Sequence, residues 1–182
     1  LDFERPLPAG ELARVRPRGR RRAQHDPLQY VLGGAEFLGV KLTLDRRVLI
    51  PRPETEFLVE LVREWATANP PTGRIMDLGT GSGAIALALA RADPNATVVA
   101  VDCSAGALAL AGENATGAGL AERVSLVRSD WYASVASAEF DVIVANPPYL
   151  SAGELAQAPR EVREFEPAEA LVAEEEGLAA LR

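Results

Sequence analysis

Residues 75–84 read Ile-Met-Asp-Leu-Gly-Thr-Gly-Ser-Gly-Ala, a mostly apolar segment followed by three glycines at alternate positions. This order is typical of a buried strand that turns sharply into a helix, because glycine allows tight turns and lets a ligand approach the main chain closely. The first free N–H groups of the following helix would then point at that ligand. We therefore expect a strand at residues 75–78, a ligand-binding turn and a helix at residues 84–91.

The alternation of apolar strands and helices continues toward the carboxyl end of the chain. Further strands are predicted at residues 97–101, 124–127 and 140–145, and a second helix at residues 105–117. Continuous apolar strands separated by helices indicate an α/β fold with a parallel sheet covered on both faces.

Polar residues and glycine follow these four strands in turn, at Gly79, Asp102, Asp130 and Asn146. Ligands of open parallel sheets bind beyond the carboxyl ends of the strands, where the strand order reverses. We therefore expect these four residues to meet at one edge of the sheet.

The segment before the sheet has a different pattern. Residues 30–50 alternate apolar and polar side chains in places and predict a hairpin, with residues 45–47 near its turn. Pro51 and Pro53 end the extended region, and Thr55 or a neighbour can cap a helix over residues 54–68.

Composition excludes several classes of protein. The chain has 182 residues, a net charge of -7, one cysteine and one histidine. One cysteine cannot form an internal disulfide, and neither residue supports a metal site, so we expect no metal. Without an apolar run of about 20 residues or a signal peptide, we expect a cytoplasmic protein that spans no membrane.

The charge is unevenly distributed along the sequence. Arginines cluster near the start, at Arg14, Arg16, Arg18, Arg20, Arg21 and Arg22, and glutamates cluster at residues 161–176. We interpret both clusters as solvated surfaces. A basic surface for an acidic or RNA-bound partner is the alternative, but the acidic balance argues against direct nucleic-acid binding.

Asp102 lies about where a dinucleotide-binding fold places a carboxylate on the ribose of its ligand. The glycine turn with Ala84 also fits the loose dinucleotide fingerprint, so a nicotinamide-dependent oxidoreductase is one hypothesis. A P-loop is excluded because no Lys-Ser or Lys-Thr follows the glycines. Asp102 could also be only an acid at a helix N-terminus, and the turn could be purely structural.

Asn146-Pro147-Pro148-Tyr149 directly follows the fourth predicted strand. The two prolines stiffen the backbone and remove two N–H donors, so acceptors remain: the Asn146 side-chain oxygen and backbone carbonyls. Such acceptors suit a substrate –NH2 group, whose lone pair they orient toward an electrophile, and Tyr149 can pack on a planar substrate group. A simple strand-ending turn is the alternative.

With these motifs the chain resembles the HemK/PrmC family of peptide chain release factor glutamine methyltransferases. The resemblance covers most of the chain. It includes residues 27–33 and 36–39, the glycine turn, Asp130-Trp131-Tyr132, the Asn-Pro-Pro-Tyr tetrad and residues 162–167. Residues 49–56, Leu-Ile-Pro-Arg-Pro-Glu-Thr-Glu, are its most specific part, because nucleic-acid amino-methyltransferases share the tetrad.

The resemblance implies a class I, Rossmann-like methyltransferase sheet, incomplete here because the family sheet has seven strands. It implies residues 1–30 as the remnant of a helical N-terminal domain and linker, residues 31–72 as hairpin and connecting helix, and residues 73–182 as the catalytic domain. The cofactor would be S-adenosylmethionine, with S-adenosylhomocysteine as product. The partner would be a release factor of translation termination.

The family also implies roles for individual residues. The implied cofactor-binding residues are Gly79, Thr80, Gly81, Gly83, Asp102, Trp131 and Asn146. The implied substrate-binding residues are Phe37, Asn146, Pro147, Pro148 and Tyr149, with Asn146, Pro147 and Tyr149 also catalytic. The target is the glutamine amide of a Gly-Gly-Gln tripeptide.

Several other functions remain as alternatives. A ribosomal protein glutamine or a nucleic-acid exocyclic amine could be the methyl acceptor. A nicotinamide-dependent oxidoreductase would leave the Asn-Pro-Pro-Tyr tetrad unused, and a non-catalytic binding module would need no cofactor. Tight binding of S-adenosylmethionine would exclude both of the last two.

Overall fold

A four-stranded parallel sheet forms the centre of the computed structural model, which describes residues 8–70, 73–135 and 139–181. Its strands are β3 (Arg74–Leu78), β4 (Thr97–Asp102), β5 (Val124–Arg128) and β6 (Val142–Ala145). They lie in the order β5-β4-β3-β6, so the order reverses between β3 and β6. The predicted α/β class and parallel sheet are confirmed.

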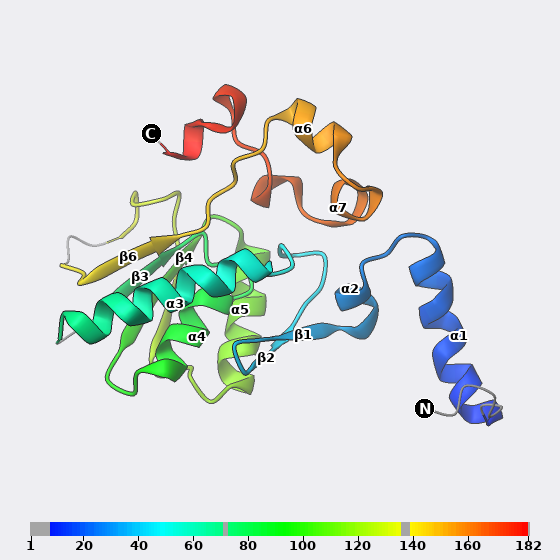
Figure 1. The fold of residues 1–182 in the computed structure, drawn as a ribbon, viewed down its shortest axis with the longest axis horizontal. Helices are drawn as coiled ribbons and strands as arrows, with labels where there is room; N and C mark the ends of the chain where they lie inside the picture. The colour runs from blue at the N-terminus through cyan, green and yellow to red at the C-terminus, as the bar shows by residue number, and fades with distance from the viewer. Residues whose placement is uncertain (1–7, 71–72, 136–138, 182) are drawn as a thin grey trace.

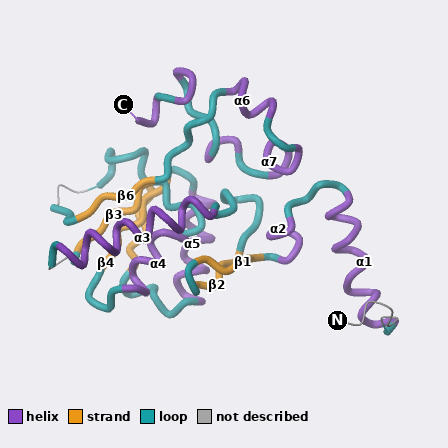
Figure 2. Tube along the Cα trace, in the orientation of Figure 1, coloured by secondary structure: helices purple, strands orange, loops and turns teal. Residues whose placement is uncertain are grey.

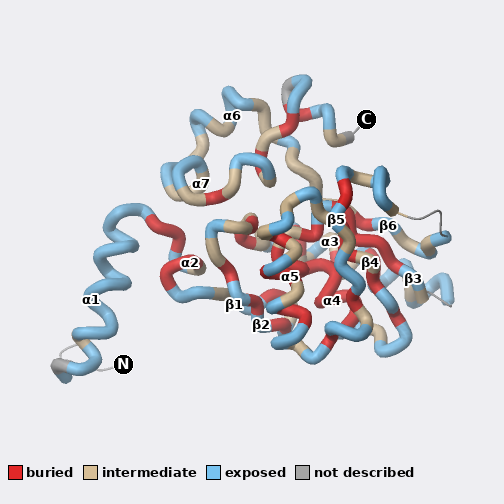
Figure 3. Tube along the Cα trace, turned by 180° about the vertical axis from the view of Figure 1, so that it is seen from behind, coloured by how far each residue is buried: buried red, intermediate tan, exposed pale blue. Residues whose placement is uncertain are grey.

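Three helices pack on one side of this sheet: α3 (Pro53–Ala68), α4 (Ala84–Ala92) and α5 (Ala105–Gly117) (Figure 1). α4 contains only alanine, isoleucine, leucine and one arginine, and residues 84–90 are all buried. It lies against β4 and contacts α3, whereas the helices and loops at the rim are mostly exposed (Figure 3). The small alanine side chains let α4 approach both neighbours closely.

The opposite face of the sheet is covered by loop residues. Met76, Leu78 and Val101 are buried there, beneath partly buried residues that include Trp131 and Phe140. In the described part of the chain, β5 and β6 are joined without a helix, so loop residues provide this cover. The sheet is therefore covered on both faces, as predicted, with helices on one face and loop residues on the other.

A short hairpin precedes the sheet and is smaller than predicted. β1 (Gly34–Phe37) and β2 (Val40–Thr43) pair antiparallel and are joined by Leu38 and Gly39, whose φ angles are 45° and 79°. Two positive φ angles suit the tight turn of a hairpin. Residues 45–47, predicted near the turn, therefore follow the hairpin instead.

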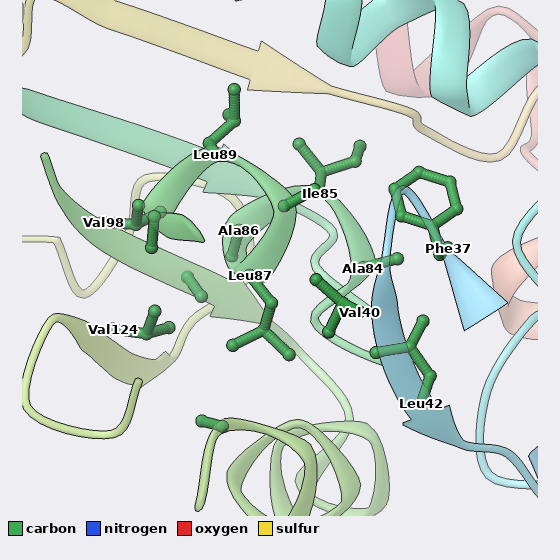
Figure 4. Close-up of a cluster of buried hydrophobic side chains, with 14 of the residues drawn as sticks. Phe37, Val40, Leu42, Ala84, Ile85, Ala86, Leu87, Leu89, Val98 and Val124 are labelled. Atoms are coloured by element: carbon green, nitrogen blue, oxygen red, sulfur yellow. The ribbon is translucent and has the colours of Figure 1, made fainter. Parts of the chain in front are cut away.

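The hairpin is joined to the main core rather than standing apart. The side chains of Val40 and Leu42 lie beside α4 (Figure 4), and both are buried. The Asn114 carboxamide of α5 accepts a hydrogen bond from Thr43 N at 2.7 Å and donates one to Thr43 O at 3.1 Å.

The first helix of the described chain lies outside this body. α1 (Ala9–Ala23) extends away from the sheet and is followed by α2 (Leu28–Leu32) (Figures 1 and 2). The arginine cluster lies on exposed α1, as predicted, although Arg21 pairs with Asp26 at 2.7 Å and Arg22 with Glu161 at 2.9 Å.

The chain after β6 forms short helical segments above the carboxyl edge of the sheet. These are α6 (Ala152–Gln157), α7 (Arg160–Phe165), η1 (Ala168–Ala170), η2 (Glu175–Gly177) and η3 (Ala179–Leu181) (Figures 1 and 2). An isolated parallel bridge between Leu150 and Val172 closes this segment into a loop. Its return to the sheet edge brings later residues near the ends of the strands.

Gly83, at the start of α4, provides a test of the packing beneath the glycine turn. Its φ of 82° costs about 1–2 kcal/mol for a residue with a Cβ. An added Cβ would also lie 3.3 Å from Leu87 Cδ1 and 3.4 Å from Ala111 Cβ. We expect Gly83→Ala to lower the free energy of unfolding by about 2 kcal/mol in urea titrations. Gly117→Ala is the control, since nothing lies within 4 Å of its added Cβ; equal stability of the two variants would contradict the expectation.

Candidate functional site

A cavity of about 270 Å³ lies at the carboxyl ends of the four parallel strands. Gly79, Asp102, Asp130 and Asn146 all line it, one at the carboxyl end of each strand, as predicted from their positions in the sequence. Further lining comes from the start of α3 and from the segment that follows α7. The cavity is therefore formed by the sheet edge together with two distant segments.

The glycine turn provides an open main-chain surface in this cavity. Gly79 and Gly81 have φ angles of 74° and 55°, and no atom lies within 4 Å of an added Cβ at either position. Thr80 lines the cavity between them, whereas Gly83 does not line it. The turn thus leaves room for a ligand against Gly79 and Gly81, while Gly83 serves the packing of α4.

Asp102 fixes the turn and faces the same cavity. Its Oδ2 accepts a hydrogen bond from Gly81 N at 2.8 Å, and its Oδ1 accepts one from Ser104 N at 2.9 Å. The N-cap of α5 is Ser104, so Asp102 does not cap that helix. A carboxylate offers about four acceptor positions, which leaves room for two ligand hydroxyl groups.

Asp77 supports the glycine turn from within the core, and the sequence analysis did not single it out. It is fully buried, and its Oδ2 accepts hydrogen bonds from Thr80 Oγ1 at 2.7 Å and Ala86 N at 3.2 Å. Its Oδ1 has no partner within the described residues. Burial raises the pKa of Asp77 to about 6 despite these two hydrogen bonds. The signal in the sequence that could have identified Asp77 is an acidic residue within an otherwise apolar strand.

Trp131 places a large ring at the cavity in an unusual backbone conformation. Its φ is 47°, in the left-handed region that bulky residues rarely adopt. The residue lines the cavity and packs against the cluster of Met76, Leu78 and Val101. Strain of this kind is found most often at ligand sites, where the surrounding structure maintains it.

Only two of the four residues of the Asn-Pro-Pro-Tyr tetrad line the cavity. Asn146 and Pro148 line it, whereas Pro147 and Tyr149 do not, and Tyr149 is 61% exposed. The Asn146 side chain donates from Nδ2 to Thr55 Oγ1 at 3.3 Å. The two prolines provide no N–H, so acceptor oxygens predominate here.

Phe37 requires a correction. Its side chain is 2% exposed, lies in the main core beside Ile85 and Ala84 (Figure 4), and does not line the cavity. The tight hairpin turn after Phe37 directs the ring inward to α4. We therefore assign it to the core and not to a substrate site.

An ion pair that the sequence did not predict holds the last segment at the cavity. Arg52 Nη2 lies 2.7 Å from Glu166 Oε1, and Ile50 N donates to Glu166 Oε2 at 3.3 Å. The Glu166 side chain is only 2% exposed, although we interpreted its cluster as solvated. This contact brings Pro167 and Glu169 to the cavity wall.

The model of the methyltransferase small domain family matches residues 53–165, which include the glycine turn, Asp102 and the tetrad. The chain belongs to this family.

Among methyltransferases, the chain is similar in sequence to curated release factor glutamine methyltransferases. A release factor glutamine methyltransferase of Chlorobaculum tepidum is 44% identical over 95% of this chain and 62% of its own length. Its namesake from Streptococcus pneumoniae is 48% identical over 88% of this chain and 56% of its own length. The resemblance found in the sequence is confirmed, although the chain spans only about three fifths of the length of these relatives.

Solved structures of methyltransferases share the fold. The hMettl16 catalytic domain in complex with a MAT2A 3'UTR hairpin is 17% identical, with a TM-score of 0.64 over 96% of this chain and 71% of that chain. A SAM dependent methyltransferase from Agrobacterium tumefaciens is 23% identical, with a TM-score of 0.55 over 65% of this chain and 40% of that chain. These similarities establish the class I fold and nothing finer.

Within the described residues, no group of three or more histidine, cysteine, aspartate or glutamate side chains could hold a metal ion. In the same part of the chain, none of the helices has the length and apolar character needed to cross a membrane.

Asp77 predicts a pH dependence of stability. Its pKa is raised from 3.8 to about 6, so the native protein holds this proton more tightly than the unfolded chain does. The resulting stabilisation is present below about pH 4 and is lost as the pH rises through 6. Relative to Asp77→Asn, the wild-type free energy of unfolding should fall by about 2–3 kcal/mol between pH 4 and 7. Urea unfolding at both pH values measures this, and a difference independent of pH would contradict it.

Proposed function

We propose that the chain transfers a methyl group from S-adenosylmethionine to the side-chain amide nitrogen of the glutamine in the Gly-Gly-Gln tripeptide of peptide chain release factors. The similarity to release factor glutamine methyltransferases over most of this chain is the observation that carries the proposal. Such a substrate places the activity in the cytoplasm.

The cavity suits this cofactor. Gly79 and Gly81 expose main chain over open space, where the methionine part would lie. Asp102 would hold the ribose hydroxyls, and the Trp131 ring would lie at the adenine. Asp102, Asp130 and Glu169 outnumber Arg47 among the charged residues that line the cavity, so the wall is negative and favours a cationic ligand. When bound, S-adenosylmethionine supplies a methyl group on a positively charged sulfur and leaves as S-adenosylhomocysteine.

Asn146 would orient the substrate nitrogen. An amide nitrogen is a weak nucleophile because its lone pair is delocalised, so it needs accurate placement. The Asn146 Oδ1 can accept one N–H of the substrate amide and stabilise positive charge as it develops on nitrogen. Asn146 and Asp102 line the same cavity, so the acceptor group and the ribose carboxylate face one space. Alignment of this kind can supply roughly 7 to 11 kcal/mol of barrier reduction in the best intramolecular models.

Pro147, Pro148 and Tyr149 would guide the substrate chain. Tyr149 is 61% exposed and follows Asn146 by three positions, so a macromolecular substrate can reach its ring. The rigid prolines fix the path of the main chain between the two side chains. The acidic wall and the net charge of -7 favour a protein over a nucleic acid as the methyl acceptor.

Asp102 allows a direct test of cofactor binding. Asp102→Asn removes a charge from the ribose hydrogen bonds, so we expect affinity for S-adenosylmethionine to fall by about tenfold to a hundredfold in isothermal titration calorimetry. Asp93→Asn is the matched control, because Asp93 follows α4 and does not line the cavity. Unchanged affinity in Asp102→Asn would contradict the assigned role.

The substrate is tested by transfer of labelled methyl from S-adenosylmethionine to a purified release factor, using the full-length enzyme. We expect label on the natural factor and none on a factor with Gln→Ala in its Gly-Gly-Gln tripeptide. Asn146→Ala should lower the rate by about 10²–10³-fold. Label on neither factor, with cofactor binding intact, would overturn the release factor assignment and direct the assay to ribosomal protein and RNA.

A further inference from the structure

The carboxyl end of the Asn-Pro-Pro-Tyr tetrad is held by a segment to which the proposed function gives no role. Leu150, the residue directly after the tetrad, donates from its main-chain N to Leu171 O at 2.9 Å. Ala173 N donates back to Leu150 O at 3.0 Å. These two hydrogen bonds flank the parallel bridge between Leu150 and Val172. Main-chain contacts to a later part of the chain therefore fix the position at which the tetrad ends.

Gly177 brings the same later segment directly onto the tetrad. Its φ is 92°, in the left-handed region, and an added Cβ would clash with the main-chain oxygen of Tyr149 and lie 3.0 Å from the carbonyl carbon. The main chain cannot move aside as the end of a flexible side chain can, so glycine is required for this close approach. Gly177 N also donates to Ala173 O at 3.2 Å, which ties the close approach to the bridge. We call residues 171–177 the brace.

The tetrad depends on its two ends, because little holds its middle. Strand β6 ends at Ala145. In the described part of the chain, no main-chain hydrogen bond holds Pro147, Pro148 or Tyr149. Both prolines have a fixed φ angle, so they can absorb little of a displacement by local rotation. A shift at Tyr149 is therefore passed along a stiff main chain to Asn146, which lines the cavity.

We infer that the brace positions the Asn-Pro-Pro-Tyr tetrad for methyl transfer and that Gly177 is its positioning residue. The inference rests on the proposed function and deepens it. The brace holds Tyr149 and thereby sets where the Asn146 acceptor meets the substrate amide. A side chain at position 177 must displace either the brace or the tetrad. A displacement of about 1 Å at a reacting group can lower a rate by about a hundredfold.

Gly177→Ala in the full-length enzyme tests this role. We expect kcat on the release factor to fall by about tenfold to a hundredfold, because the tetrad is displaced. Affinity for S-adenosylmethionine, measured by calorimetry, should change by less than about threefold, since Gly79, Gly81 and Asp102 lie on other elements. A loss of kcat without a loss of cofactor affinity separates a displaced tetrad from a general loosening of the site.

Gly119→Ala is the matched control. Gly119 also has a positive φ, 69°, so alanine brings the same kind of backbone strain there, but nothing lies within 4 Å of an added Cβ. The residue follows α5 and does not line the cavity. This variant should lose stability and keep the wild-type kcat. Urea unfolding of both variants sets a temperature at which each is fully folded during the assay.

Hydrogen exchange, followed by NMR, gives a measurement that needs no variant. In the wild-type protein, the protection factors of the Leu150 and Ala173 amides should exceed that of the Tyr149 amide by about tenfold or more. Tyr149 is the internal reference because its amide has no main-chain partner within the described residues. Gly177→Ala should remove most of the difference, since the clash separates the brace from the tetrad.

Each result bears on the inference in a different way. Equal kcat in Gly177→Ala and Gly119→Ala would overturn it while the proposed function stands. A loss of cofactor affinity as large as the loss of kcat would also overturn it, because the whole site would then be loosened. Leu150 and Ala173 amides no better protected than Tyr149 would show that the brace does not form, whether or not Gly177→Ala folds. Absence of methyl transfer by the wild-type enzyme would overturn the proposed function and this inference with it.

Discussion

The turn from β3 into α4 depends on one buried carboxylate. Asp77 points from the strand into the core and accepts hydrogen bonds from Thr80 and from the first turn of α4. Strand, turn and helix are thereby tied at one atom, Oδ2, while Gly79 and Gly81 curve outward over open space. A charge is costly in such a position. The Asp77 carboxylate therefore lowers the stability of the fold, but its two hydrogen bonds fix the geometry of the turn.

From this turn the site is completed by segments far apart in the sequence. The strand ends bring Asp102 and Asn146 to one edge because the strands run parallel. The start of α3 adds Thr55, and the ion pair between Arg52 and Glu166 brings the last segment over the cavity. The strand ends and the glycine turn thus form the floor of the cavity. Its wall is held by polar contacts between residues far apart in the sequence.

Much of this arrangement could be predicted from the sequence, because the spacing of apolar residues and the positions of glycines are local signals. The strands, α3, α4 and α5 lie close to their predicted positions, and four residues after the strands line one cavity. Contacts that depend on distant partners could not be predicted. Glu166 lies within a run of acids that resembles a solvated surface, and nothing local distinguishes it. Phe37 was misplaced because a two-residue hairpin turn directs its ring into the core.

The ion pair between Arg52 and Glu166 joins residues that are 114 positions apart. Contacts of such sequence separation form late, because a long loop must close before they can contribute. As the chain emerges from the ribosome, the sheet edge and the glycine turn precede Glu166, so Arg52 stays unpaired until that residue appears. The cavity wall is therefore completed only after the four strands beneath it have been synthesised.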